Sequence, residues 1–115
     1  MITALAAMAG FLAVAFGAFG AHALGDTMGD EASGWWETAT LYLLVHAALA
    51  TAITAQSSEK FGTAAAILLA GAVLFAATLY AMALGAPRWF GAITPIGGLG
   101  MLAGWAMIAW AAFKT

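Results

Sequence analysis

The chain contains no cysteine and very little charge. Its 115 residues include three Lys or Arg and five Asp or Glu, and these charged residues make up 7% of the sequence. An average soluble protein contains about 25%. The absence of cysteine excludes disulfides, thiolate nucleophiles, iron–sulfur ligation and cysteine-type zinc sites. The net charge of −2 is too small to indicate nucleic acid as a partner.

Most of the chain is apolar. They make up 65% of the chain, and the mean hydropathy is +1.01. Four long stretches contain no Asp, Glu, Lys or Arg: Met1–Gly25, Thr38–Ser58, Phe61–Pro87 and Trp89–Phe113. Each is longer than the roughly 20 residues that a helix needs to cross about 30 Å of hydrocarbon. The pattern predicts a protein that crosses a membrane several times, with membrane lipid as its surroundings.

The expected fold is all-α, because lipid cannot satisfy the hydrogen bonds of a bare backbone. The charge breakpoints place helices at about 2–24, 35–56, 61–84 and 94–113, with Asp26–Gly34 as an acidic loop. Thr94 is expected to cap the last helix, with Pro95 at its first position. Short turns force neighbouring helices to be antiparallel. We therefore predict a single domain over residues 1–115, an integral membrane four-helix up-down-up-down bundle.

The start of the chain carries one pattern typical of secretory signals. Ala21-His22-Ala23 fits a small-x-small cleavage site. However, no Lys or Arg precedes the apolar run, and the run is longer than a normal signal core, so we expect a retained first helix. Lys60 and Lys114 fall on the side of the N-terminus and Arg88 on the other, which favours both termini in the cytoplasm.

Small residues form a line along the first expected helix, at a spacing of four, three, four and three. Such a line lies on one face and lets two helix backbones approach closely. The residues are Ala6, Gly10, Ala13, Gly17 and Gly20, and the last helix repeats the device with Gly97, Gly100, Gly104 and Ala111. One interpretation is packing within the protein. The alternative is an interface with a second copy or with a larger membrane complex.

Polar side chains inside a membrane are candidates for function, because placing them there is unfavourable. The candidates are His22, Glu37, Thr38, Tyr42, His46, Tyr80 and Arg88. Thr38, Tyr42 and His46 are spaced by four and share one stripe of their helix. The whole set lies in the half of the bundle near the acidic loop. It predicts either a hydrogen-bond network that fixes helix rotation or a shallow site open to that side.

One pairing within this set is specific. Antiparallel packing across the acidic loop places His22 at the depth of Glu37, which suggests a hydrogen bond or ion pair. The alternative is that His22 ends its helix, while Glu37 lies in a first turn favoured by the helix dipole.

The sequence gives little reason to expect a cofactor or an enzyme. His22 and His46 differ in depth by more than roughly 10 Å at 1.5 Å per residue, too far to ligate one haem iron. No metal-binding H-E-x-x-H spacing and no nucleophile elbow occurs in the sequence. We therefore expect no metal, no cofactor and no catalytic residue.

Several motifs together resemble the YgdD/YwdK-like family of small inner-membrane proteins, a domain of unknown function. They cover nearly the whole chain, and the first and last are the most specific. The resemblance implies a compact four-helix protein of the inner membrane and brings no activity or substrate. The motifs are Gly17–Leu24 (GAFGAHAL), Tyr42 with His46, Leu79-Tyr80, Ile93–Gly98 (ITPIGG) and Gly104-Trp105.

Two functional hypotheses follow. The first is a non-enzymatic structural or accessory protein that packs or self-associates through its small-residue helix faces. The second is a small carrier or channel for protons or a small solute, which would use the polar residues of one half of the bundle. Four short helices without a mid-span break enclose little volume, which favours the first.

Overall fold

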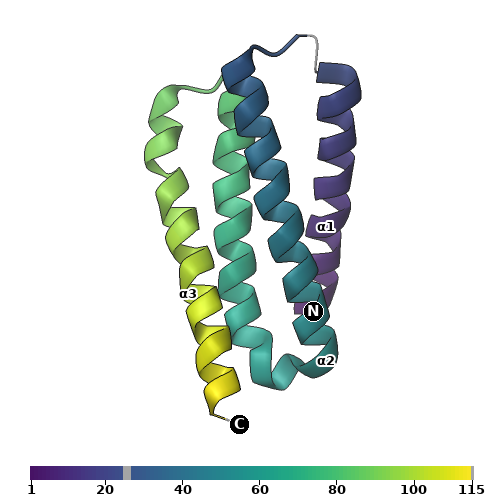
Figure 1. Ribbon diagram of the computed structural model, residues 1–115, viewed down its shortest axis with the longest axis vertical. Coiled ribbons are helices and arrows are strands. Elements are labelled where there is room, and N and C mark those ends of the chain that lie inside the picture. The colour runs from purple at the N-terminus through teal and green to yellow at the C-terminus, as the bar shows by residue number, and fades with distance from the viewer. Residues whose placement is uncertain (25–26, 115) are drawn as a thin grey trace.

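The chain folds entirely into helices in a computed structural model that describes residues 1–24 and 27–114. Helix α1 spans Ile2–Phe19 and continues into a π-helical turn, η1, at Gly20–Leu24. Helix α2 spans Asp30–Ala83 (Figure 1). A short 3-10 helix, η2, at Arg88–Ala92 leads into α3, Thr94–Phe113. The all-helical prediction is confirmed.

The number of helices differs from the expected four, because the described residues form three long α-helices. The two expected helices at 35–56 and 61–84 are one element, α2, with 54 residues. Inside it only Ser57 leaves helical geometry, with φ −156° and ψ 94°, and the chain reverses direction there (Figure 1). The backbone N–H of Lys60 donates to Ser57 Oγ at 3.2 Å, so helical geometry resumes directly after the kink.

Helix α2 also begins earlier than expected. It starts at Asp30, within the segment predicted to be an acidic loop, and Asp30 and Glu31 occupy its first turn. Carboxylates in this position interact favourably with the positive end of the helix dipole. The acidic residues therefore extend the helix.

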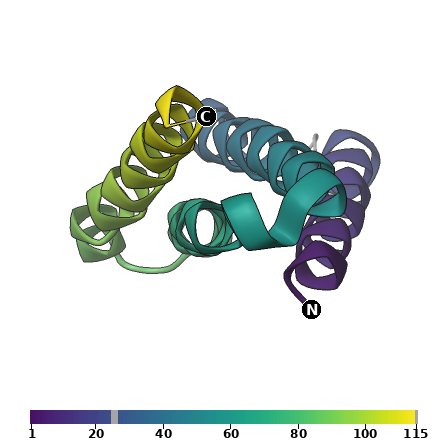
Figure 2. The ribbon, with the colours of Figure 1, turned by 90° about the horizontal axis from the view of Figure 1, so that it is seen from below.

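The two halves of α2 form the centre of the molecule. Helices α1 and α3 each pack against α2 and lie on opposite sides of it (Figure 2). The molecule measures 49 × 27 × 19 Å. Its long dimension matches a bilayer of about 40–45 Å including the headgroup regions.

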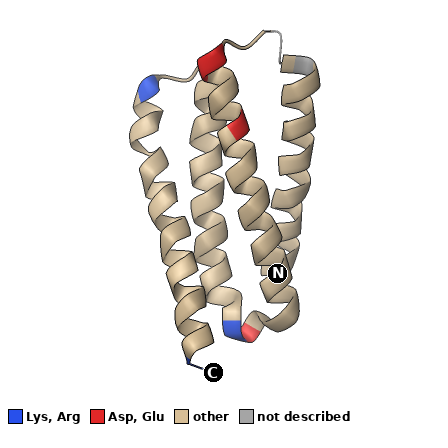
Figure 3. Ribbon diagram, in the orientation of Figure 1, with Lys and Arg blue, Asp and Glu red and all other residues tan. Residues whose placement is uncertain are grey.

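The charged residues of the described chain lie toward the ends of the helices, and long stretches without Lys, Arg, Asp or Glu run between them (Figure 3). Large side chains such as Phe11, Leu99 and Leu102 are 74%, 65% and 66% exposed. Three described stretches are long and apolar enough to cross a membrane: Ile2–His22, Asp30–Ala83 and Arg88–Phe113. Exposed apolar area of this extent is typical of a surface that faces lipid or a protein partner.

The small-residue line of α1 faces α2. Ala6 and Ala13 are completely buried. A Cβ on Gly10 would lie 3.7 Å from Ala47 Cβ, and one on Gly17 would lie 3.1 Å from Thr40 Cγ2. This line is occupied by contacts inside the protein.

The glycines of α3 are also turned inward, against the second half of α2. A Cβ on Gly97 would lie 2.5 Å from the backbone nitrogen of Phe75, and one on Gly104 would lie 2.5 Å from Leu68 Cβ. Gly100 faces Gly71 in the same contact. Most residues of the two lines that sequence offered for self-association are therefore already used within one chain.

The start of α3 corrects one further expectation. Ile93, rather than Thr94, is the N-cap residue, and no side chain caps this end. Thr94 is the first helical residue and Pro95 follows it. The Thr94 hydroxyl instead bonds that of Thr78 at 2.7 Å, where both residues are buried, and so links α3 to α2.

Candidate functional site: a groove between α2 and α3

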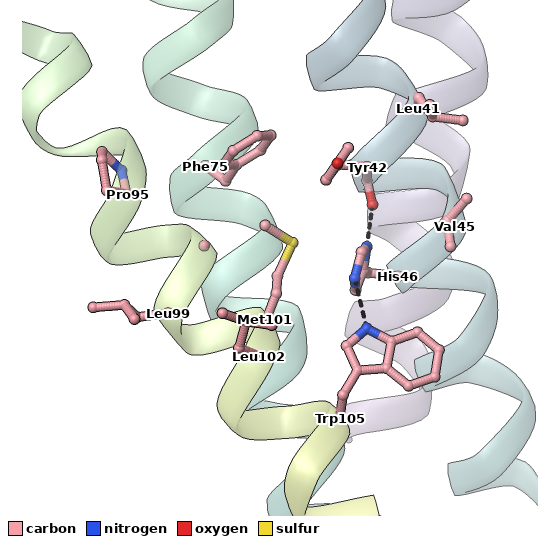
Figure 4. A pocket seen from close by; sticks show the side chains of 11 residues that line it. Leu41, Tyr42, Val45, His46, Phe75, Pro95, Leu99, Met101, Leu102 and Trp105 are labelled. Atoms are coloured by element: carbon pink, nitrogen blue, oxygen red, sulfur yellow. Dashed lines mark hydrogen bonds between the residues drawn. The ribbon is translucent and has the colours of Figure 1, made fainter.

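A groove of about 750 Å³ lies on the side of the molecule between the first half of α2 and α3 (Figure 4). Its lining is mostly aromatic and aliphatic, with few polar atoms. Such a lining is typical of sites that bind apolar ligands. The walls include Tyr42 and His46 from the first half of α2, Phe75 from the second half, and Pro95, Gly98, Leu99, Leu102 and Trp105 from α3.

His46 connects the two walls of this groove. The indole N–H of Trp105 donates to His46 Nε2 at 3.1 Å, and His46 Nδ1 lies 2.6 Å from the Tyr42 carbonyl oxygen (Figure 4). An indole N–H can only donate, so Nε2 accepts and Nδ1 carries the proton. The imidazole is therefore neutral, buried and bonded at both nitrogens. Its geometry fixes the position of α3 relative to α2.

Tyr42 forms part of the groove wall. Its ring stacks on Phe75 with a centroid distance of 4.8 Å, and its side chain remains 39% exposed. The hydroxyl has no hydrogen-bond partner within residues 1–24 and 27–114. A phenol group at membrane depth with a free O–H is available to a ligand in the groove.

The charged end of the molecule stands above the same face of α2. Arg88 Nη2 forms an ion pair with Glu31 Oε1, and its guanidinium lies 5.4 Å from the Trp35 ring centroid. Glu31, Trp35, Tyr42 and His46 are spaced by four, seven and four, so they share one stripe of the helix. The ion pair therefore lies on the stripe that lines the groove.

A second cluster lies on the opposite side of α2, against α1. The indole N–H of Trp36 donates to the Phe16 carbonyl oxygen at 2.7 Å, just before the π-helical turn. A Cβ on Gly20 would overlap the Trp36 indole. The Tyr80 ring packs edge-on against Phe16 and Trp36, and its hydroxyl bonds that of Thr40 at 2.7 Å. This cluster ties both halves of α2 to α1.

The structure divides the polar residues that sequence grouped together. Tyr42 and His46 share the groove, while Tyr80 belongs to the cluster against α1. Thr38 is exposed. His22 and Glu37 are also exposed, and no hydrogen bond joins them in the described part of the chain. The predicted His22–Glu37 contact is therefore wrong, because each side chain faces the surface of the molecule. Arg88 does reach the acidic residues, through Glu31.

Sequence reasoning missed the partners that complete the site. Trp105 entered only as part of a family motif and Phe75 not at all, although an indole N–H in the middle of a membrane helix needs an acceptor. That requirement indicates that Trp105 has an acceptor, but it does not identify His46 as the acceptor. Nothing in the spacing of α2 indicated that Phe75 stacks on Tyr42.

A second groove, of about 720 Å³, runs between α1 and the first half of α2. Its walls are rich in small residues. The residues are Ala7, Gly10, Ala15, Ala47, Ala48 and Ala52, with Phe11, Val14, Leu44 and Thr51 around them.

An all-helical chain with a lipid-compatible surface and charge at its two ends is the architecture of a small integral membrane protein. Residues 16–98 match the family described as protein of unknown function (DUF423). The chain belongs to this family, whose curated relatives are membrane proteins. No solved structure matches it.

Three relatives illustrate the similarity. The UPF0382 inner membrane protein YgdD of Escherichia coli K12 is 42% identical over 107 residues, which cover 90% of this chain and 82% of the relative. A UPF0382 membrane protein of Haemophilus influenzae is 40% identical over 114 residues, covering 96% and 92%. The UPF0382 membrane protein SH2409 of Staphylococcus haemolyticus is 38% identical over 113 residues, covering 96% and 93%.

Proposed function

We propose that this protein is a non-enzymatic accessory protein of the cell's inner membrane, which acts by packing against the transmembrane helix of another subunit. In this proposal α1, the two halves of α2, and α3 make four antiparallel crossings. The reversal at Ser57 supports the fourth crossing. Lys60 and Lys114, at the opposite end of the bundle from Arg88, support cytoplasmic termini.

The observation that carries the proposal is the groove between α1 and α2. Its exposed small residues, including Ala7, Ala48 and Ala52, allow the backbone of a further helix to approach closely. Close backbone approach is what stabilises helix association in lipid, where apolar side chains gain nothing by leaving the hydrocarbon. Most of the inner small-residue positions are filled by contacts within the chain, whereas this groove is open to a partner.

The carrier or channel alternative receives less support from the geometry. Both ring nitrogens of His46 are already bonded, so it has no free position for a moving proton. His22 and Glu37 lie at the surface without a bond between them. The large grooves open sideways along the helices, whereas a channel would need a path along the bundle axis.

A photo-crosslinking amino acid placed at Ala48 tests the proposal in intact membranes. We expect a discrete crosslinked protein product, because this side chain would lie against the partner helix. Mass spectrometry of the product then separates a second copy of this chain from a different subunit.

The matched control is the same probe at Val73, which is 45% exposed on the second half of α2 and lies outside this groove. A product at Ala48 and none at Val73 supports the proposal. Lipid adducts alone at Ala48, or equal protein products at both positions, would remove it.

A further inference from the structure

The groove between α2 and α3 differs from the α1–α2 groove in that it has a chemical gradient along its length. Its lower end is closed by the Trp105–His46 hydrogen bond, and its middle is aliphatic and aromatic. Above it stand the Glu31–Arg88 ion pair and Trp35. An apolar channel with a charged head end is complementary to an amphipathic molecule.

The groove, together with the stretch of α2 above it, matches the length of one leaflet of a bilayer. The α3 wall of the groove, from Pro95 to Trp105, is about 15 Å long at 1.5 Å per residue, and Trp35, which lies above the groove, is about 16 Å from His46 along α2. Half of the hydrocarbon core is about 15 Å. Trp35 marks the interface level, where indole rings concentrate. A single hydrocarbon chain that enters at Trp35 would therefore end near His46.

The charged residues above the groove, Arg88 and Glu31, determine which lipid headgroup can bind there. Arg88 and Glu31 remain 74% and 58% exposed, although they pair with each other. Arg88 has five N–H donors and the ion pair occupies one nitrogen, so donors remain for a phosphate. Asp30 precedes Glu31 in the first turn of α2 and adds a second carboxylate at this end of the molecule. This surplus of carboxylates disfavours a purely anionic headgroup and favours one that also carries an ammonium group.

We propose that this groove binds one zwitterionic glycerophospholipid. Its phosphate contacts Arg88, its ammonium group lies beside Glu31, and one acyl chain runs past Tyr42 and Leu99 to Trp105. Helical side chains lean toward the helix N-terminus, so the Tyr42 hydroxyl reaches toward the headgroup and can donate to an ester carbonyl. The site is separate from the α1–α2 groove and does not depend on the partner proposed above.

Gly98 supplies a sharp test. It lines the groove, and a Cβ added there meets nothing within 4 Å, so Gly98→Leu fills the groove without a clash at its Cβ. Gly98→Ala is the matched control, because it replaces the same helical glycine and leaves the groove open. The full-length protein in mild detergent is mixed with phosphatidylethanolamine and phosphatidylglycerol of identical acyl chains, and native mass spectrometry measures the lipid retained.

We expect the wild-type protein and Gly98→Ala to retain one phosphatidylethanolamine in preference to phosphatidylglycerol. Gly98→Leu should lose this adduct, and Arg88→Gln should weaken it about tenfold, as removal of a charge-assisted hydrogen bond does. Equal retention of both lipids by the wild-type protein, or retention unchanged in Gly98→Leu, would overturn the proposal.

A second measurement uses only the wild-type protein, so its result does not depend on whether Gly98→Leu folds. Phosphatidylethanolamine with a diazirine in the middle of one chain is photolysed with the wild-type protein. Labelling concentrated on peptides that contain Tyr42–His46 and Leu99–Trp105 supports the site. Labelling spread evenly over all lipid-facing helices indicates surrounding bulk lipid only and contradicts it.

Discussion

Gly20 is the residue at which local backbone geometry and long-range packing meet. It begins the π-helical turn that follows α1, and its missing side chain leaves the space that the Trp36 indole occupies. The indole then donates to the Phe16 carbonyl, one turn earlier in α1. Single π turns are often retained where a protein needs an unusual backbone shape. Here the turn lies beside the acceptor for a tryptophan of the next helix.

Gly20→Ala is therefore expected to destabilise the protein. The added methyl group overlaps the Trp36 ring, and overpacking of this kind costs about 1–3 kcal/mol. Alanine favours the helix by about 0.5–1 kcal/mol, which offsets only part of the loss. The free energy of unfolding in detergent micelles measures the net effect.

The matched control for this prediction is Gly34→Ala. Gly34 is also helical, and a Cβ there meets nothing within 4 Å, so stability should stay the same or increase. Equal effects of the two substitutions would show that the Trp36 contact does not limit position 20.

At the scale of elements, α2 is the helix that organises the others. Its first half presents one face to α1 and another to α3, and its second half contacts both through Tyr80 and Gly71. Ser57 separates the halves, with its hydroxyl accepting the N–H of Lys60. This bond is the N-cap interaction by which a serine begins a helix.

Ser57→Ala should destabilise the protein by about 1 kcal/mol, because the N–H of Lys60 loses its side-chain acceptor. Ser58→Ala is the control, since Ser58 is an exposed neighbour with helical geometry. Thermal unfolding followed by circular dichroism compares the two variants. If Ser58→Ala were the more damaging substitution, the capping role of Ser57 would be wrong.

At the scale of the whole molecule, the arrangement predicts which segments share a membrane side. The reversal within α2 lies at one end of the bundle, and the start of α2 and the link from α2 to η2 lie at the other (Figure 1). Ser58 belongs to the reversal, Gly29 is the N-cap of α2, and Ala86 lies in the link. The chain has no native cysteine, so single cysteines can be introduced without background. We expect a membrane-impermeant maleimide to label Gly29→Cys and Ala86→Cys from the periplasmic side of intact cells.

Ser58→Cys should be labelled only after the membrane is opened, because in the proposed topology that end of the bundle faces the cytoplasm. The variant Lys114→Cys should behave like Ser58→Cys. Labelling of Ser58→Cys and Gly29→Cys from the same side would contradict the crossing at Ser57.

Much of the fold followed from the sequence, for reasons that are local. The helix expected at 94–113 coincides with α3, and the helix expected at 2–24 covers α1 together with η1, because the bilayer sets the lengths of these apolar segments. The helix boundaries near Asp30 and Ser57 did not follow. Acidic residues are common both in loops and at helix N-termini, so Asp30 and Glu31 did not show where α2 begins. The sequence suggested a four-residue turn at 57–60, whereas in the structure only Ser57 leaves helical geometry.

The candidate site was less predictable than the fold. Spacing by four placed Tyr42 and His46 on one stripe, because both lie on one helix. Their partners Phe75 and Trp105 come from other segments, and their approach depends on how α3 crosses α2. The same dependence explains why His22 and Glu37, matched in depth along two helices, do not meet.

The sequence by itself determined that this chain is helical, that it lies in a membrane, and where its charge lies. Composition and run length decide these properties, since each depends only on the free energy of moving residues between water and lipid. Only the tertiary structure decided which helix faces pack inside the protein and which remain at its surface. Most residues of the two small-residue lines are turned inward, whereas the groove between α2 and α3 and the groove between α1 and α2 remain open at the surface. Helix rotation and crossing set that outcome, and they depend on contacts between residues far apart in the chain.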